Sequence, residues 1–427
     1  MTRDTSTADI KEFQVISPKY SRDFRREGIP VQLNYFESIF DNTVRFEIFC
    51  ADSRKLIFDG GEKVYLKLED SYGNVLNFAD DDNQMRIHGI INSDQFVQTA
   101  ASTFHMYSKE CIDDRDVEKR VVKNYTGKIS DTVFAVLKEF LKTPKQLDIE
   151  ETLNNYNYTG RINDFGKPFY VINDLSAKSI PVLQSSKGTM AGFLFYETGG
   201  KNGSTYHFRS VENLKKQDYK KTYILSDTSY IPTGYDGKIL NARSTKNINL
   251  DDKLDKADMF QSTLRTYDPR KQEILETVFN SENQNNILGT ENPFLVDNLD
   301  FSNISTRYDI KTLDTGSNVP GLTFQEQLDN GDQINYDVES IYRQSLIAYN
   351  KLLTIEVVIK IYIDLSLHAG DIIFCDFREI SLDKSQTVQS QKSGLYMIEE
   401  LRHKIVSGEH QYTFLKLVRD SVGRKPF

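Results

Sequence analysis

Hydrophobic and polar residues alternate in two groups of four short stretches, one in each half of the chain. The first group comprises residues 43–50, 61–68, 85–91 and 103–108, and the second comprises 354–363, 370–377, 394–405 and 410–418. A period of two predicts half-buried β-strands. In the clearest case, 354–363, one strand face carries Ile355, Val357, Ile359, Ile361 and Ile363. Both groups are therefore expected to form β-sheet.

The two groups also agree in order and spacing. Gly61 and Gly370 each precede an acidic residue and begin the second strand of their group; Ile87 follows Gly61 by 26 residues, and Met397 follows Gly370 by 27. Such spacing is also common among unrelated all-β proteins, so a duplicated unit and a chance likeness are both open on pattern alone. If the unit is duplicated, Gly61 should superimpose on Gly370, and Ile87 should lie near Met397.

Between the groups the apolar period becomes helical. Residues 129–143 predict a helix, with Ser130 as N-cap and Pro144 after its end. Its buried face would carry Ile129, Val133, Phe134, Leu137, Phe140 and Leu141. A second helix is expected from Pro168 to about Ile180. The stretch 192–211 predicts a hairpin around the turn Gly-Gly-Lys-Asn-Gly.

The changes of pattern divide the chain into segments. Residues 281–340 are rich in Asn, Asp and Gln and contain only one Lys and one Arg, which predicts a polar insertion with little regular structure. The second β-segment would then be discontinuous and include strands at 239–250 and 258–268 and a helix at 338–352. The expected segments are 1–28, a flexible N-terminal arm; 29–112, all-β; 113–212, a small α/β domain; 213–280 with 341–427, a second β-segment; and 281–340, the insertion.

Composition narrows the function. The 427 residues carry a net charge of −9, which argues against wrapping nucleic acid. Cys50, Cys111 and Cys375 lie far apart without a Cys-x-x-Cys pair, so neither a zinc site nor a disulfide framework is indicated. The N-terminal residues are polar, with no secretion signal, and no apolar run approaches the ~18 residues that span a membrane.

The sequence carries none of the common catalytic or cofactor-binding motifs. The sequence contains no Gly-x-x-x-x-Gly-Lys-Ser/Thr, Gly-x-Ser-x-Gly or His-Glu-x-x-His. The acidic runs Asp80–Asp82 and Asp251–Asp252 lack calcium-loop spacing. The six histidines, expected to be structural, occur singly: His88, His105, His207, His368, His403 and His410. No catalytic, cofactor-binding or metal-binding residue is therefore predicted, and no enzymatic activity.

Taken in order, several stretches resemble the baseplate hub proteins of contractile-tailed phages related to the T-even group. The similarity covers roughly residues 30–270 and 341–424. Each stretch is structural, so specificity lies in their order. They are VVKNYTGKISDTVFAVLKEFLKT (121–143), TGRINDFGKPFYVINDLSAKS (159–179), GFLFYETGGKNGSTYHFRSV (192–211), GLYMIEELRHKI (394–405) and QYTFLKLVRDSVG (411–423).

The resemblance implies a fold class of α+β, mostly β: two similar antiparallel β-barrel domains joined by a small α/β domain, with the polar insertion in the second barrel. It also implies a homotrimer with pseudo-sixfold symmetry in the tail baseplate of a virion, assembled in the host cytoplasm. The implied partners are tail tube or tube-initiator proteins, a trimeric central spike and baseplate wedge proteins. DNA would pass through the channel without specific binding, and no membrane is involved.

Two other functions are open at this point: the hub of a phage-like contractile injection system, and a baseplate-associated cell-wall hydrolase. In the hub, the channel wall is expected to be neutral to negative, because a basic wall would hold the DNA phosphates. Glu47, Glu356 and Asp376 are candidate residues of that wall.

Overall fold

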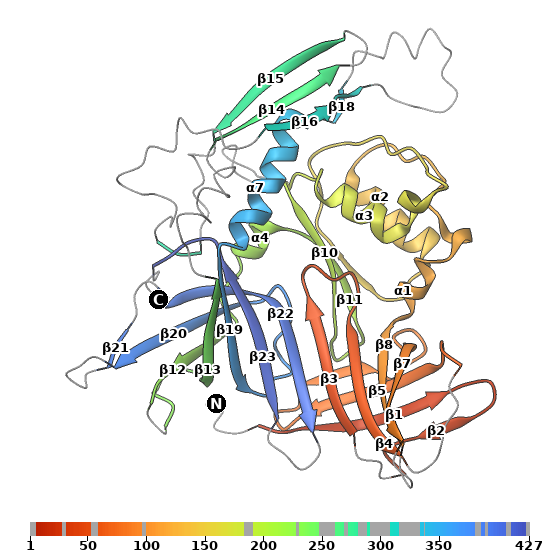
Figure 1. Cartoon of the computed structure of the whole chain (residues 1–427), viewed down its shortest axis with the longest axis vertical. Coiled ribbons are helices and arrows are strands. Elements are labelled where there is room, and N and C mark those ends of the chain that lie inside the picture. Colours follow the sequence, from red (N-terminus) through yellow and green to blue (C-terminus); the bar gives the residue numbers. More distant parts are fainter. Residues whose placement is uncertain are drawn as a thin grey trace.

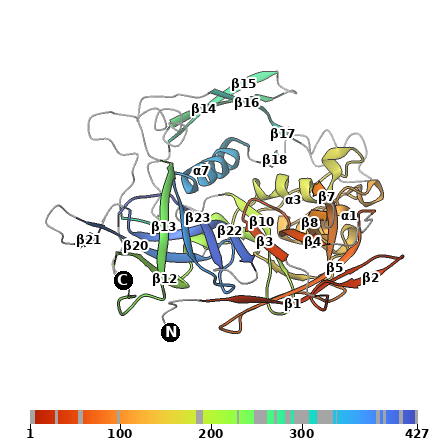
Figure 2. The same ribbon diagram turned by 60° about the horizontal axis from the view of Figure 1, so that its bottom comes forward.

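The computed structural model of the chain describes residues 6–27, 31–52, 59–95, 100–182, 191–227, 230–246, 261–268, 272–280, 288–290, 308–315, 334–336, 338–380, 386–388, 392–406 and 411–423. A single 15-stranded sheet organises most of them, with the order β2-β1-β5-β7-β8-β4-β3-β22-β23-β19-β13-β12-β20-β21 and β6 paired to β5. Figures 1 and 2 show its two halves side by side.

The first β-unit is the half that comes first in the chain. Its strands are β1 (Ala8–Ile16), β2 (Ser21–Asp23), β3 (Val31–Ser38), β4 (Arg45–Asp52), β5 (Lys63–Asp70), β6 (Val75–Phe78), β7 (Met85–Gln95) and β8 (Ala100–Ser108). The strand β1 lies antiparallel to β5, with Phe13, Val15 and Phe24 buried. The expectation of a flexible arm at 1–28 is therefore wrong over these residues. The strand was not predicted because only Phe13 and Val15 alternate with polar residues there, and charged residues surround them.

The second β-unit closes on itself. Its strands are β12 (Lys221–Leu225), β13 (Gly237–Lys246), β19 (Ile355–Tyr362), β20 (Ile372–Ile380), β21 (Gln386–Val388), β22 (Gly394–Val406) and β23 (Tyr412–Arg419). The order β22-β23-β19-β13-β12-β20 returns to β22 through a β20–β22 pairing, which makes a closed barrel. Antiparallel pairing of β3 with β22 joins the two units, and one buried apolar cluster contains residues of both.

The strand order and the pairing pattern agree with the predicted duplication, with a shift of one residue. The strand order β4-β8-β7-β5 of the first unit repeats as β19-β23-β22-β20. Ile87 pairs with Met106 on β8, as Ile398 pairs with Leu417 on β23. A register shift follows immediately after both Ile87 and Ile398. The true equivalent of Ile87 is thus Ile398, one residue beyond the predicted Met397.

The repeated glycine makes the same contacts in both units. The amide of Gly61 donates to the carbonyl of Ile87 at 2.8 Å, and that of Gly370 donates to Ile398 at 2.8 Å. The φ angles are +83° and +87°. This region of backbone space costs other residues roughly 1–2 kcal/mol, which explains why glycine alone is identical between the two stretches.

The chain between the two units forms a compact α/β region above the first unit (Figure 1). The antiparallel hairpin β10–β11, confirmed as predicted, carries β9 parallel to β11. The elements are α1 (Lys109–Asp113), a 3₁₀ turn (Val117–Lys119), α2 (Ile129–Ala135), a π-helical turn (Val136–Phe140), β9 (Gln146–Ile149), a 3₁₀ turn (Asp164–Gly166), α3 (Pro168–Ser176), β10 (Phe193–Thr198), β11 (Thr205–Ser210) and α4 (Val211–Lys215).

The two predicted helices form, with corrections. The first begins with Lys128 in the N-cap position, so Ser130 is too far inside the first turn to cap it. Phe134, expected on the buried face, is 51% exposed. Its neighbours Val133 and Leu137 are buried, and the π-helical turn at the end shifts the phase of the buried stripe.

The remaining elements depart most from expectation. The strand predicted at 258–268 does not join the second barrel: β14 (Gln261–Asp268) pairs with β15 (Glu273–Asn280) and with β16 (Tyr308–Thr312) in a separate sheet, which stands away from both β-units in Figures 1 and 2. Most of 281–340 lies outside the described residues. Those described include β16, β17 (Asp314–Thr315) and β18 (Ile334–Tyr336). A π-helical turn (Val338–Tyr342) and α7 (Arg343–Leu352) confirm the predicted helix.

Within the described residues, no helix has the length and apolar character needed to cross a membrane. The boundaries of the five sequence segments stay predictions.

Candidate functional site

Glu37 joins three parts of the chain at one buried carboxylate. The carboxylate accepts hydrogen bonds from the Tyr35 hydroxyl at 2.6 Å, the Gly199 amide at 2.8 Å and the Ala369 amide at 2.9 Å. His368 Nδ1 lies 3.1 Å from the same group. These donors belong to β3, the β10–β11 turn and the loop before β20. Glu37 therefore holds the first unit, the α/β region and the second unit together.

The charges of this junction stabilise one another. Burial would raise the pKa of Glu37, but His368 and the Tyr35 hydroxyl outweigh it, so the pKa lies below its ordinary value. Burial would lower the pKa of His368, but Glu37 outweighs it and raises the pKa. The pair therefore favours the carboxylate and the imidazolium together.

Lys145 forms a second buried joint between the α/β region and the first unit. Its ammonium lies 2.7 Å from Glu110 and 2.7 Å from Glu197, and all three side chains are at most 2% exposed. Glu197 also accepts from the Ser108 hydroxyl at 2.6 Å and the Val44 amide at 3.1 Å. Burial would lower the pKa of Lys145, but the two carboxylates outweigh it and raise the pKa.

These networks were not predicted from the sequence, although one signal was available. Glu197 lies in an otherwise apolar and aromatic strand, FLFYET, where an unpaired charge would be costly. The partners of Glu197 could not be identified, because they lie far along the chain. Chemically, both networks fix charges in place.

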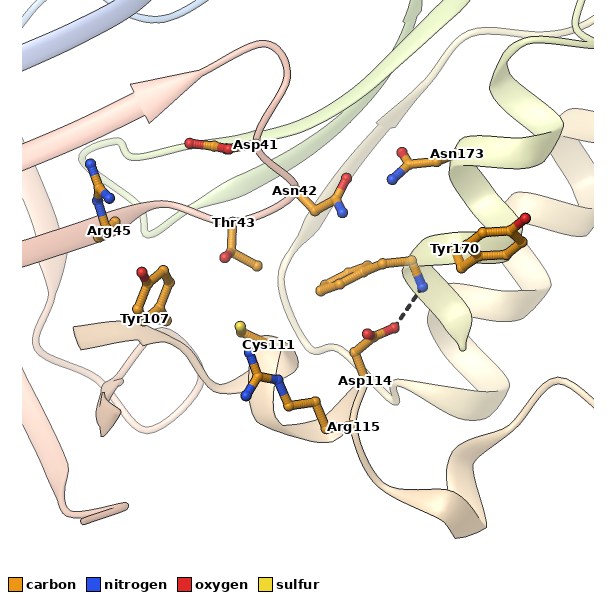
Figure 3. A pocket seen from close by; sticks show the side chains of 11 residues that line it. Asp41, Asn42, Thr43, Arg45, Tyr107, Cys111, Asp114, Arg115, Tyr170 and Asn173 are labelled. Carbon is orange, nitrogen blue, oxygen red and sulfur yellow. Dashed lines mark hydrogen bonds between the residues drawn. The ribbon is translucent and has the colours of Figure 1, made fainter. Parts of the chain in front are cut away.

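A cleft beside α3 has a volume of about 440 Å³. Figure 3 shows Arg45 and Tyr107 on one side and Tyr170 and Asn173 on the other. At its base Asp114 accepts a hydrogen bond from the Phe169 amide at 2.7 Å, in the first turn of α3. The lining residues are Asp41, Asn42, Thr43, Arg45, Tyr107, Cys111, Asp114, Arg115, Phe169, Tyr170 and Asn173.

Burial changes the pKa of two groups in this cleft, and for the cysteine the change is away from reactivity. Burial raises the pKa of the Cys111 thiol, which therefore stays protonated, and also raises the pKa of Asp114. A reactive cysteine needs the opposite shift. The cleft can hold a small polar group but offers no activated thiolate.

The described histidines make structural contacts. His207 lies between Asp148 at 2.9 Å and Thr198 at 2.8 Å, and His403 contacts Thr413 at 2.8 Å. His88 is exposed, while His410 lies outside the described residues. Over the described ranges, no three His, Cys, Asp or Glu residues are grouped as a metal site. The lack of a catalytic or metal site stays a prediction.

The three residues expected on the channel wall lie in different environments. Asp376 is fully buried inside the second unit and bonded by the Tyr235 hydroxyl, so its placement on an exposed wall is wrong. Strand alternation had placed it with the polar face, but both faces of β20 are covered there. Glu47 and Glu356 are half-buried on the face of the sheet that points away from the core, which we call the open face. Glu47 lies 3.7 Å from His105.

Two inner strands of the shared sheet pair with one of their two neighbours over only part of their length, among the described residues. On β7, the pairing with β8 continues to Gln95, whereas the backbone hydrogen bonds on the other side, to β5 and the residues just before it, end at Ile87. On β13, residues 239–246 pair with β19, whereas the pairing with β12 stops at Lys238. Unpaired strand edges are ready to accept another strand.

Comparison with known proteins places the fold. The tail protein from Neisseria meningitidis MC58 matches with a TM-score of 0.53 at 8% sequence identity, covering 98% of this chain and 98% of that one. The 43 kDa tail protein of prophage MuSo2 from Shewanella oneidensis matches with a TM-score of 0.51 at 8% identity, covering 96% and 99%. No family model matches the sequence. No curated protein sequence matches it either. The chain thus has the fold of these phage tail proteins, and the predicted fold class is confirmed.

Proposed function

We propose that the chain is a structural subunit of a phage tail baseplate hub, a homotrimer whose six β-units form a ring around a DNA channel. One observation carries the proposal: the contact between the two units within a chain can be repeated between chains. Two structural neighbours with the same fold are tail proteins, which supports a role in the tail.

Within the chain, β3 of the first unit pairs with residues 400–406 of β22 in the second, with Tyr35 opposite His403. The duplication gives each partner an equivalent. β13 corresponds to β3, because Ser244 pairs with Val357 as Tyr35 pairs with Phe46. Residues 89–95 of β7 correspond to residues 400–406 of β22, since both follow the same register shift.

These equivalents are residues 89–95 of β7 and 239–243 of β13, along which the ladder with β5 or with β12 has already ended. The same antiparallel contact can therefore form between β13 of one copy and β7 of the next. Carrying the register across places Arg243 opposite Ser93 of the next copy and Asn241 opposite Gln95. Such a head-to-tail contact generates a ring when its rotation closes, and it covers both open edges.

The geometry suits a closed ring. A row of residues paired across neighbouring strands begins at Arg86 on β7 and ends at Asn241 on β13, the eighth strand. In the next copy Asn241 would pair with Gln95 of β7, so the row moves along β7 from residue 86 to residue 95 on passing from one copy to the next. That climb of about nine residues is roughly 30 Å, against roughly 38 Å across eight strands. The resulting strand tilt of roughly 38° lies within the range of about 35–45° found in barrels.

Three copies would contribute roughly 24 strands to the inner wall, more than the 16–18 that already leave an aqueous channel in porins. Six similar units would match the subunits of a hexameric tail tube on one side, and the true threefold symmetry would match a trimeric spike on the other. Baseplate wedge proteins would bind around the outside, and the assembly would reside in the virion tail.

The test is the mass of the purified full-length protein by size-exclusion chromatography with light scattering, alone and with its tail partners, followed by electron microscopy. The proposal predicts three chains in a ring with six similar units. A monomer both in solution and in assembled tails would overturn it. A murein-hydrolysis assay on the same sample should show no activity, whereas turnover would favour the cell-wall hydrolase.

A further inference from the structure

A row of residues crosses the open face of the shared sheet and alternates cations with aromatic rings. Each member pairs directly with the next across neighbouring strands. All are half-buried or exposed, whereas the residues before and after them on most strands are buried. In order, the row is Arg86, Tyr107, Arg45, Phe36, Arg402, Phe414, Lys360 and Asn241; we call it the cation–aromatic row.

The cations of the row rest on rings. The guanidinium of Arg45 lies 4.2 Å from the ring centroid of Phe36, and that of Arg402 lies 4.4 Å from Phe414. Lys360 lies 3.5 Å from the ring centroid of Tyr412. Stacking of this kind fixes a cation while leaving its charge uncompensated.

The cations have no acidic partner within the described part of the chain: no carboxylate lies within ion-pairing distance of Arg45, Arg402 or Lys360. The Nε atoms of Arg45 and Arg402 are also shielded from solvent and lack a hydrogen-bond acceptor. In a chain of net charge −9, four cations in line without a carboxylate form a local positive band. Arg45 and Tyr107 also line the cleft of Figure 3.

The band is narrow. Glu47 lies two residues from Arg45 on β4, and Glu400 lies two residues from Arg402 on β22. Successive cations are two strands apart, about 9–10 Å. In the proposed ring, this row would depart from the expected neutral to negative wall. The sequence could not show it, because Arg45, Phe36 and Arg402 become neighbours only through strand pairing.

We infer that the cation–aromatic row is a contact site for the phosphate backbone of nucleic acid. The inference rests on the proposed function, in which the open face lines the channel that DNA crosses. Charge complementarity favours a polyanion, and three of the four cations are arginines, whose planar guanidinium pairs with phosphate in a bidentate manner. An acidic peptide is the other class of polyanion that such a band could attract.

The row fits weak contact rather than capture. Each phosphate contact is an exchange with counterions, so its strength falls steeply with salt. A band one residue deep, flanked by glutamates, holds few phosphates at once. Because the row follows strand pairing, it would be inclined to the channel axis, and three copies would contribute three such inclined rows.

The experiment measures binding of a short fluorescent DNA duplex to the purified full-length protein by anisotropy over a series of NaCl concentrations. The row predicts binding at low salt without sequence preference. Arg45→Gln and Arg402→Gln should each lower the slope of log K against log salt by about 0.9 for every phosphate that the variant no longer neutralises. Arg402→Lys should keep the slope, because the charge remains. Lys123→Gln, which removes an exposed lysine of the α/β region, is the matched control and should bind as wild type does.

Light scattering on the same samples separates this inference from the proposed function. A protein that binds duplex through the row but is monomeric both in solution and in assembled tails would contradict the ring and leave the row intact. A ring that shows no binding at low salt would overturn the row and leave the ring intact. A salt slope unchanged in the Arg45→Gln, Arg402→Gln double variant, or an equal reduction in Lys123→Gln, would also overturn it. Binding of polyglutamate in place of duplex would reassign the row to an acidic peptide.

Discussion

Replacement of Lys145 by methionine is expected to destabilise the protein strongly at neutral pH. The substitution keeps the length of the side chain but leaves Glu110 and Glu197 buried without the ammonium that each contacts at 2.7 Å. Removing one member of a buried ion pair costs about 3–5 kcal/mol, because an uncompensated charge remains. At roughly 2–4 °C per kcal/mol for a folding unit of 150–250 residues, the melting temperature should fall by roughly 10 °C.

The destabilisation should depend on pH. Burial alone would raise the pKa of Glu110, but Lys145 lowers it. The ionised Glu110 therefore stabilises the folded protein above its unfolded pKa, and this stabilisation is lost as the pH falls through its folded pKa. Without Lys145 burial dominates, and the pKa of Glu110 should rise above its unfolded value. The deficit of the variant should therefore be full at pH 7 and shrink as the pH falls through that raised pKa.

Far-ultraviolet circular dichroism suits the assay, since the chain contains no tryptophan. The control is Lys123→Met, which breaks an exposed contact to Glu139 and should melt like wild type. A destabilisation at pH 7 of under about 1 kcal/mol for Lys145→Met, the scale of a surface pair, would refute the reasoning.

Two further predictions concern the other junction and the repeated glycine. Glu37→Gln should lower the melting temperature. For His368→Gln, the loss of stability relative to wild type should depend on pH, because the pKa of His368 is raised in the folded protein. This difference in stability should be fully present below the unfolded histidine pKa of about 6.5 and should disappear as the pH rises through the folded pKa. A difference that widens in alkali would contradict the pairing. Gly370→Ala should destabilise the protein more than Gly61→Ala. At both positions alanine would be strained by the positive φ. A Cβ at Gly370 would also lie 2.5 Å from the Tyr196 hydroxyl, whereas a Cβ at Gly61 would have no atom within 4 Å. Equal melting temperatures for the two variants would show that the close approach has no effect.

Local pattern predicted the elements that repeat. Strand alternation and the glycine before an acid located both β-units, since each signal depends on residues adjacent in the chain. The residue equivalent to Ile87 was predicted one position too early. Spacing along the chain pointed to Met397, whereas the amide of Gly370 donates to Ile398 as that of Gly61 donates to Ile87. That displacement reflects pairing between strands, which a spacing along the chain does not report.

Features that depend on distant partners could not be predicted. The strand β1 was expected to be loose, because its burial depends on pairing with β5. The acid in FLFYET was visible, but its partner Lys145 lies 52 residues away. The cation–aromatic row requires Phe36 and Arg402 to become neighbours, which happens only when β3 meets β22. In each case the residues were visible in the sequence, but their contacts form only in the folded chain.

The central claim is the contact between β13 of one copy and β7 of the next, and a paired-cysteine experiment tests it most directly. Arg243→Cys with Ser93→Cys places two thiols opposite each other in the proposed register, within the Cα separation of about 4.4–6.8 Å that a disulfide needs. Arg243→Cys with Asn92→Cys is the control, because adjacent strand positions face opposite sides. On a non-reducing gel the first pair should give covalent species up to three chains and no larger. No cross-link in the first pair, or equal cross-linking in both pairs, would contradict the ring.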